Sequence, residues 1–154
     1  ADKESVRLFK KTGAYLVPTL LAGHTVMKMA KESDFMSDAI KVKAIDVSSA
    51  MAGNFTKAYE AGVNIAYGTD SGVSRHGTNA YEAILMYEAG MSASDILKSA
   101  TVNAADLIDH GDSLGTVEPG KHADIIATAL SPLKDITALL KVDFVMKGGV
   151  IVKQ

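Results

Sequence analysis

The sequence predicts an α/β fold that ends in an all-β segment. Helical and strand-like patterns alternate over the first 114 residues, an order typical of parallel strands joined by helices. From about Gly115 the pattern changes to short β-rich runs. Within these runs, Gly148-Gly149 in "VMKGGVIV" is the strongest hairpin signal of the chain. We therefore expect two parts, residues 1–114 and residues 115–154.

Two helices and two strands are expected in the N-terminal part, in the order helix, strand, helix, strand. They cover residues 2–11, 14–20, 38–61 and 63–68. Gly13 supplies the stop of the first helix, and Pro18 suits a strand that runs into a loop, because proline cannot donate to a sheet ladder. The long helix has apolar residues at spacings of three and four from Ile40 to Ala58, and it stops at Gly62.

Three shorter helices and a set of strands are expected to follow. The helices cover residues 79–89, 92–100 and 103–108. Ser92 and Asp95 form a capping pair for the second of them, and Asn103 is placed to cap the third. "LGTVEPGKHADIIATA" predicts a Pro-Gly turn that leads into a strand, and "DFVMKGGVIVKQ" predicts the hairpin.

Composition excludes several classes of protein. The chain has 154 residues, 47% of them hydrophobic and 22% charged, and its net charge of −2 comes without a basic stripe, so nucleic acid is not an expected partner. The longest apolar run, residues 15–23, is too short for a membrane span. The absence of cysteine excludes disulfides, thiolate zinc sites and a cysteine nucleophile. A cytoplasmic location is our expectation, and the first residues, "ADKESVRLFKK", suggest an internal start.

The segment "YGTDSGVSRHG" is the strongest candidate for a functional site. Its Asp-Ser-Gly fits a serine nucleophile, an aspartic-protease carboxylate or a metal-binding aspartate at a strand end. Both protease interpretations are disfavoured, because serine proteases of the trypsin type and aspartic proteases consist almost wholly of strands. An aspartic protease also needs two carboxylates, and only one Asp-Ser-Gly occurs here. Ser71 has no histidine placed as its base, so we expect it to bond to the turn backbone. Asp70 follows the second strand, where functional loops of parallel barrels begin, although it could also simply cap the turn.

Four motifs in order extend this interpretation over almost the whole chain. They are "VNIAYGTDSG", "HGTNAYEAILMYEAGMSASDILKSATVNAADLI", "LGTVEPGKHADIIA" and "VMKGGVIVK". Together they resemble the C-terminal part of a metal-dependent amidohydrolase, in the branch of imidazolonepropionase-like enzymes and prolidase-type dipeptidases. The resemblance implies a (β/α)₈ TIM-like barrel with a small β-sandwich. Residues 14–20 and 63–68 would be barrel strands seven and eight, and residues 115–154 would be sandwich strands.

The resemblance also implies a chemistry. Asp70 matches the strand-eight aspartate, which ligates a divalent metal, zinc as one or two ions, and shuttles a proton during hydrolysis of a C–N bond in a peptide-like or cyclic amide. The family's His-x-His pair, bridging lysine or glutamate, and single histidines on strands five and six have no match here. We therefore expect about a third of an amidohydrolase, inactive alone and in need of its N-terminal barrel portion, whether as a fragment, one part of a split enzyme or a degenerate protein.

The remaining candidates are polar residues near the two strand ends. His76 and Arg75 lie in the loop after the second strand and are expected to contact substrate, and His24 is expected to line a pocket. His110 and His122 are expected to be solvated. A second hypothesis is a non-catalytic interaction module, because two strands without neighbours expose edges that favour pairing with a partner chain or a homo-oligomer.

Overall fold

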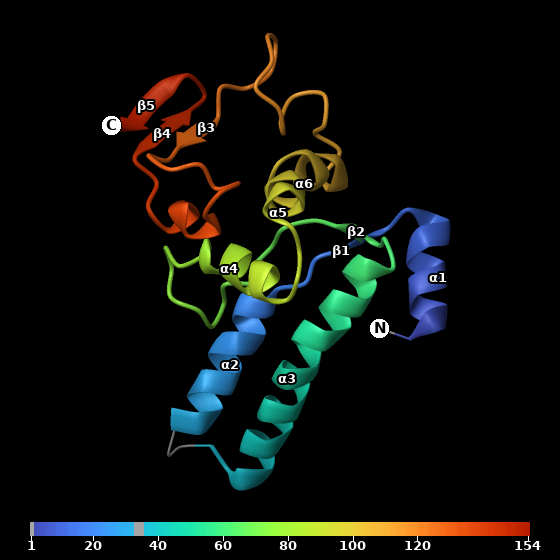
Figure 1. Ribbon diagram of the computed structural model, residues 1–154. Coiled ribbons are helices and arrows are strands. Elements are labelled where there is room, and N and C mark those ends of the chain that lie inside the picture. Colours follow the sequence, from blue (N-terminus) through green and yellow to red (C-terminus); the bar gives the residue numbers. More distant parts are fainter. Residues whose placement is uncertain (1, 33–35) are drawn as a thin grey trace.

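The computed structural model describes residues 2–32 and 36–154 (Figure 1). Its N-terminal part contains α1 (Lys3–Thr12), β1 (Tyr15–Leu16), α2 (Leu20–Glu32), α3 (Asp38–Glu60), β2 (Asn64–Ile65), α4 (Tyr81–Glu88), α5 (Ala93–Ala100) and α6 (Val102–Leu107). Its C-terminal part contains β3 (Ile125–Ala127), the 3₁₀-helix η1 (Ile136–Leu140), β4 (Phe144–Lys147) and β5 (Val150–Lys153). The predicted α/β class is confirmed. Among the described residues, no helix is long and apolar enough to cross a membrane.

Two separate sheets organise the described part of the chain. β1 and β2 pair in parallel, with Tyr15 opposite Asn64 and Leu16 opposite Ile65. β3, β4 and β5 form an antiparallel sheet in that order. The β4–β5 turn is the predicted one: Gly148 and Gly149 have φ values of 56° and 82°, the left-handed region that two-residue hairpin loops require.

The first strand is shorter than predicted, and a helix follows it that the sequence did not indicate. Only Tyr15 and Leu16 are in strand conformation, and α2 begins at Leu20 where a loop was expected. The first turn of α2 contains no acidic residue, so the usual local start signal is absent. Figure 1 shows α2 and α3 side by side, as a pair that extends away from the two sheets.

Helix ends follow local chemistry in most places. The Asp2 side chain accepts from the Ser5 N–H at 2.8 Å, and Gly62 ends α3 with a φ of 75°. Ser92 Oγ accepts from the Asp95 N–H at 3.1 Å, so the predicted cap of α5 is confirmed. The predicted cap at Asn103 is wrong: its side chain instead donates to the Ile65 carbonyl at 2.8 Å and ties α6 to β2.

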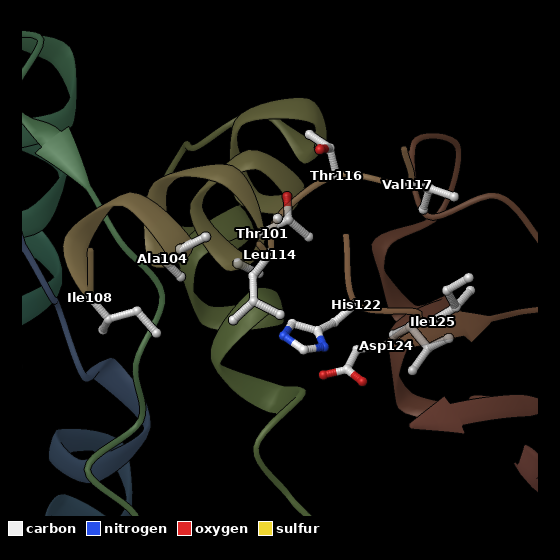
Figure 2. A pocket seen from close by; sticks show the side chains of 13 residues that line it. Thr101, Ala104, Ile108, Leu114, Thr116, Val117, His122, Asp124 and Ile125 are labelled. Carbon is white, nitrogen blue, oxygen red and sulfur yellow. The ribbon is translucent and has the colours of Figure 1, made fainter. Parts of the chain in front are cut away.

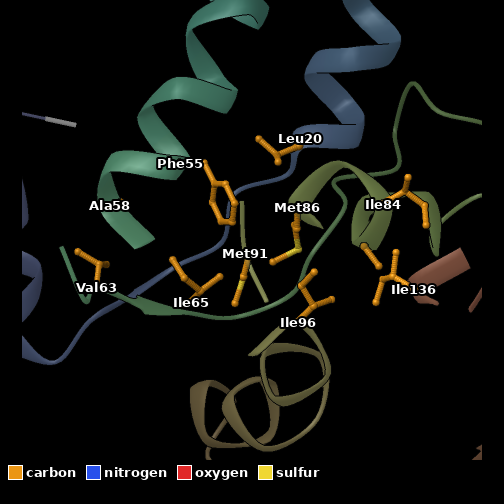
Figure 3. Close-up of a cluster of buried hydrophobic side chains, with 11 residues drawn as sticks. Leu20, Phe55, Ala58, Val63, Ile65, Ile84, Met86, Met91, Ile96 and Ile136 are labelled. Carbon is orange, nitrogen blue, oxygen red and sulfur yellow. The ribbon is translucent and has the colours of Figure 1, made fainter. Parts of the chain in front are cut away.

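One hydrophobic core joins the helices to the parallel strands (Figure 3). Its members are Leu20, Phe55, Ala58, Val63, Ile65, Ala83, Ile84, Met86, Met91, Ile96 and Ile136. Ile136 comes from η1, so the segment after residue 115 contributes to the same core as α3 and α4. The core therefore extends across the predicted division at residues 114 and 115 through Ile136.

Candidate functional site

Asp70 lies just beyond the end of β2, in an unusual backbone conformation. It is exposed and has a φ of 46°, a left-handed value that is uncommon outside glycine and that aspartate tolerates better than most residues. Its carbonyl accepts from the Gly72 N–H at 2.7 Å, which closes a tight turn. Left-handed non-glycine residues cluster at functional sites, so this backbone marks Asp70 as a candidate.

An open hollow of about 440 Å³ lies between α2, α3 and Asp70. Thr19, at the exit of β1, also lines it and also has a positive φ, 47°. The other lining residues are Ala22, Gly23, Val26, Ile40, Lys43, Ala44, Val47, Ser48 and Met51. The exits of both parallel strands thus contribute a left-handed residue to one mostly apolar hollow.

Hydroxyl and amide groups hold the loop around Asp70. The Ser71 hydroxyl bonds with the Thr69 hydroxyl at 2.9 Å and accepts from the Ser74 hydroxyl at 3.0 Å. The Asn79 side-chain amide donates to Thr69 Oγ1 at 3.2 Å. Ser71 therefore bonds to neighbouring side chains, where we expected the turn backbone. Its hydrogen-bond partners in the described chain include no histidine.

Gly68 permits the close approach of the two strand exits. A Cβ at position 68 would lie 2.5 Å from Val17 Cγ1, closer than real side-chain atoms come. A Cβ at Gly72 would meet nothing within 4 Å, and Gly72 has no positive φ. Only Gly68 is required by packing at this turn.

Gly68→Ala should therefore destabilise the chain by about 1–3 kcal/mol, the usual cost of forcing a methyl group into a packed site. Urea unfolding followed by circular dichroism would measure it. Gly72→Ala is the matched control and should change the free energy of unfolding by less than about 0.5 kcal/mol. Val17→Ala should restore much of the loss in the double variant; no rescue would contradict the clash with Val17.

Two polar side chains behind this loop were not predicted, the buried Glu82 and the half-buried Tyr67. The Glu82 side chain has no exposed surface, and its carboxylate oxygens accept from the Leu20 N–H at 2.8 Å and the Leu21 N–H at 2.6 Å. The Tyr67 hydroxyl donates to the Asn79 carbonyl at 2.6 Å and accepts from the Ala83 N–H at 3.1 Å. Glu82 thus links α4 to the start of α2, and Tyr67 links the end of β2 to the start of α4 across the intervening loop.

Burial governs the protonation of both groups. It raises the pKa of Glu82, against the opposing effect of the two N–H donors. It also raises the pKa of Tyr67, with a smaller contribution from the nearby Glu82 charge. The tyrosine therefore keeps the proton that it donates to Asn79. The only local signal was Glu82 as an acid in the first turn of a helix, and nothing local identified its partners.

The other predicted substrate contacts lie away from the hollow. Arg75 and His76 are exposed, and neither lines the hollow beside Asp70. His24 lines a different cavity, of about 290 Å³, and its ring tilts against Tyr81 with 5.7 Å between centroids. His24 thus lines a pocket as expected, but a pocket that Asp70 does not share.

A further cavity, of about 380 Å³, separates the α5–α6 corner from β3 (Figure 2). His122 and Asp124 line it side by side, and Thr116 Oγ1 is buried next to it without a hydrogen-bond partner in the described part of the chain. His110 is exposed, as expected, and its ring meets the Ser113 hydroxyl at 3.3 Å. Neither histidine approaches the hollow that Asp70 lines.

Metal binding needs several donors in one place. Within residues 2–32 and 36–154, no group of three or more His, Cys, Asp or Glu side chains could hold an ion. A structural zinc site uses four ligands, and a catalytic site keeps three from the protein. The described residues of this chain therefore do not by themselves fit a zinc ion.

Known proteins show what this arrangement is similar to. The amidohydrolase family matches residues 1–152. A crystal structure of a Xaa-Pro dipeptidase with bound methionine in the active site superimposes with a TM-score of 0.94 and 42% identity, over 99% of this chain and 38% of the dipeptidase. Ochratoxinase from Aspergillus niger is 32% identical over 99% of this chain and 32% of its own length.

A third relative belongs to the other enzyme type that the sequence indicated. Imidazolonepropionase from Thermoanaerobacter pseudethanolicus is 40% identical over 47% of this chain and 18% of its own length. This chain thus spans less than two fifths of the length of each of these relatives, and the resemblance to imidazolonepropionase-like and prolidase-type enzymes is confirmed. Given the match from residue 1 to residue 152, the chain belongs to the amidohydrolase family.

Proposed function

We propose that the polypeptide containing this chain hydrolyses a C–N bond in a peptide-like or cyclic amide, with Asp70 in the reaction. One observation carries the proposal: Asp70 lies past β2 in a left-handed backbone, on a hollow that both strand exits line. Parallel barrels place their active sites at the carboxyl ends of their strands. The family of the chain and its dipeptidase and imidazolonepropionase relatives support the reaction class.

The proposal assigns the two strands to positions in a barrel. β1 corresponds to strand seven and β2 to strand eight, within residues 1–114, and β3 to β5 belong to a β-sandwich within residues 115–154. Parallel pairing of β1 with β2, with helices between them, supports the barrel assignment. The antiparallel β3–β4–β5 sheet supports the sandwich assignment.

The role of Asp70 follows from the chemistry of amide hydrolysis. Water attacks the carbonyl carbon, the C–N bond breaks, and the leaving nitrogen needs a proton. A carboxylate beside the reacting bond accepts the proton of the attacking water and returns it to that nitrogen. We assign this transfer to Asp70.

Asp70 is also our candidate for one ligand of a divalent metal, zinc, whose other ligands would lie outside this chain. Because one carboxylate holds zinc poorly, the 154-residue chain should be inactive and bind zinc weakly, far below the about 10–16 kcal/mol of structural zinc sites. Isothermal titration calorimetry of the chain would measure the affinity. Stoichiometric binding as tight as a structural site would contradict this expectation.

The hollow suggests what kind of substrate it accepts. Its lining is mostly apolar or small, with Lys43 and Asp70 as its charged members. This composition suits an apolar side chain together with an anionic group such as a terminal carboxylate. Arg75 and His76 contact the more exposed part of the substrate, and His24 shapes the pocket behind α2.

The test is an assay of the full polypeptide that contains this chain, supplied with zinc. Dipeptides with a C-terminal proline, the same dipeptides as C-terminal amides, and cyclic amides make up the panel. We expect hydrolysis of the C–N bond, which cleaves a dipeptide or opens a cyclic amide, with free carboxylates preferred over amides. No hydrolysis of any of these compounds would overturn the proposal.

A second candidate function is assembly with another chain. All four residues of β5 are exposed, with Val150 and Val152 each 67% exposed, and β1 pairs only with β2 within the described residues. Apolar strands without cover favour pairing. Sedimentation of the 154-residue chain should then show self-association, reduced by Val152→Lys. A compact monomer at all concentrations would count against assembly.

A further inference from the structure

The hollow beside Asp70 depends on how α2 is held. Ala22, Gly23 and Val26, all within the first two turns of α2, line it directly. Thr19, which immediately precedes α2, lines it in a left-handed conformation. Whatever fixes the start of α2 therefore fixes one wall of the hollow.

Glu82 fixes that start from a distant part of the sequence. The first N–H groups of any helix lack partners inside the helix, and α2 has no acidic residue in its first turn to accept from them. The Glu82 carboxylate accepts from two of these groups, at Leu20 and Leu21, from more than 60 residues away. A buried carboxylate at a helix N-terminus also interacts favourably with the helix dipole.

Tyr67 connects the same helix, α4, to the exit of β2. Its hydroxyl bonds to Asn79 and Ala83, on either side of the start of α4. Its own N–H donates to the Ser99 carbonyl at 2.9 Å, which holds Tyr67 in place from α5. Asp70 follows Tyr67 by three residues, so the loop of Asp70 leaves from this fixed point.

We propose that Tyr67 and Glu82 are positioning residues that set the placement of Asp70 relative to the α2 wall of the hollow. Tyr67 ties α4 to the exit of β2, and Glu82 ties the same helix to the exit of β1. Thr19 immediately precedes the N–H groups that Glu82 binds, and Asp70 follows Tyr67 by three residues, so each of the two left-handed residues adjoins a segment tied to α4. The role assigned to Asp70 rests on the proposed function, whereas the mechanical link does not.

The first arm of the test measures the link without enzyme activity. In the 154-residue chain, Glu82→Gln keeps the shape of the side chain but turns an amide N–H₂ toward one of the two backbone donors. We expect hydrogen-exchange protection of the Leu20 and Leu21 amides to fall roughly tenfold or more, since a buried donor loses its acceptor. Amide chemical shifts of Thr19 and Asp70 should move as well.

Tyr67→Phe is the second variant, and it keeps the test decisive if Glu82→Gln does not fold. It removes a single oxygen, and it should lower protection at Ala83 and move the amide shifts of Asp70 and Thr19. Glu88→Gln, the same exchange at an exposed position of α4, is the control and should leave all these signals unchanged. Shifts confined to α4, with Thr19 and Asp70 unmoved in the folded variants, would overturn the proposal.

The second arm uses the full polypeptide with the substrate found above. Glu82→Gln and Tyr67→Phe should each lower kcat at least roughly tenfold, and the double variant should lose less than the product of the single losses, because both act on one link. Multiplicative losses would contradict a shared link. If the wild type hydrolyses nothing, the proposed function fails while the exchange arm still decides whether the link exists.

Discussion

Replacing Asp70 with asparagine should lower kcat of the full polypeptide about 10²–10⁴-fold, the usual contribution of a general acid or base. Asparagine has nearly the same shape and tolerates the positive φ that Asp70 adopts. Its amide, however, cannot accept the proton of the attacking water. The loss should therefore be chemical rather than conformational, and kcat at saturating substrate measures it.

Asp109 offers a matched control for this exchange. It is also an exposed aspartate with a positive φ, 58°, but it follows α6 and does not line the hollow. Asp109→Asn should leave kcat within about twofold, because substitutions far from the reacting groups rarely change catalysis. A loss below about tenfold in Asp70→Asn would contradict the role of proton shuttle. Equal losses of kcat in both variants would mean that the effect comes from replacing an aspartate with a positive φ and not from the position of Asp70.

Local patterns predicted the parts of this fold that depend on local physics. Apolar spacing and Gly62 predicted α3, Gly148 and Gly149 predicted the hairpin, and Ser92 predicted the start of α5. In each case the signal and the structure lie within a few residues of each other. The ends of the two parallel strands were predicted less well, because only two residues of each strand pair with the other strand.

The missed features all depend on contacts between distant segments. α2 lacks a local cap because Glu82 supplies it from α4, and Asn103 bonds to β2 and not to its own helix. His24 lines a pocket, as its position after the first strand predicted, but the sequence did not indicate that this pocket lies beside Tyr81 and apart from Asp70. Periodicity carries no information about which distant backbone groups a side chain reaches. The role of Asp70 itself stays a prediction.

Phe55→Ala should be the most damaging core substitution, with a loss of about 3–5 kcal/mol in the free energy of unfolding. The Phe55 side chain is 2% exposed and stacks on Tyr59, with 6.4 Å between ring centroids and 11° between planes. It packs among the core side chains drawn in Figure 3 and lies near the end of α3. Since domains of this size are stabilised by only about 5–15 kcal/mol, urea unfolding should show a large shift of the midpoint.

The beginning of α3 supplies the control, because the helix is buried at only one end. Val42 is 59% exposed, whereas Phe55 and Ala58 are each 2% exposed. Val42→Ala should change the free energy of unfolding by less than about 0.5 kcal/mol, and Phe55→Leu should fall between the two alanine variants while keeping the chain folded. If Phe55→Ala cost no more than Val42→Ala, the end of α3 would not be anchored in the core. The α3 wall of the hollow beside Asp70 would then have no fixed position, and a hollow with a loose wall could not orient a substrate toward the carboxylate.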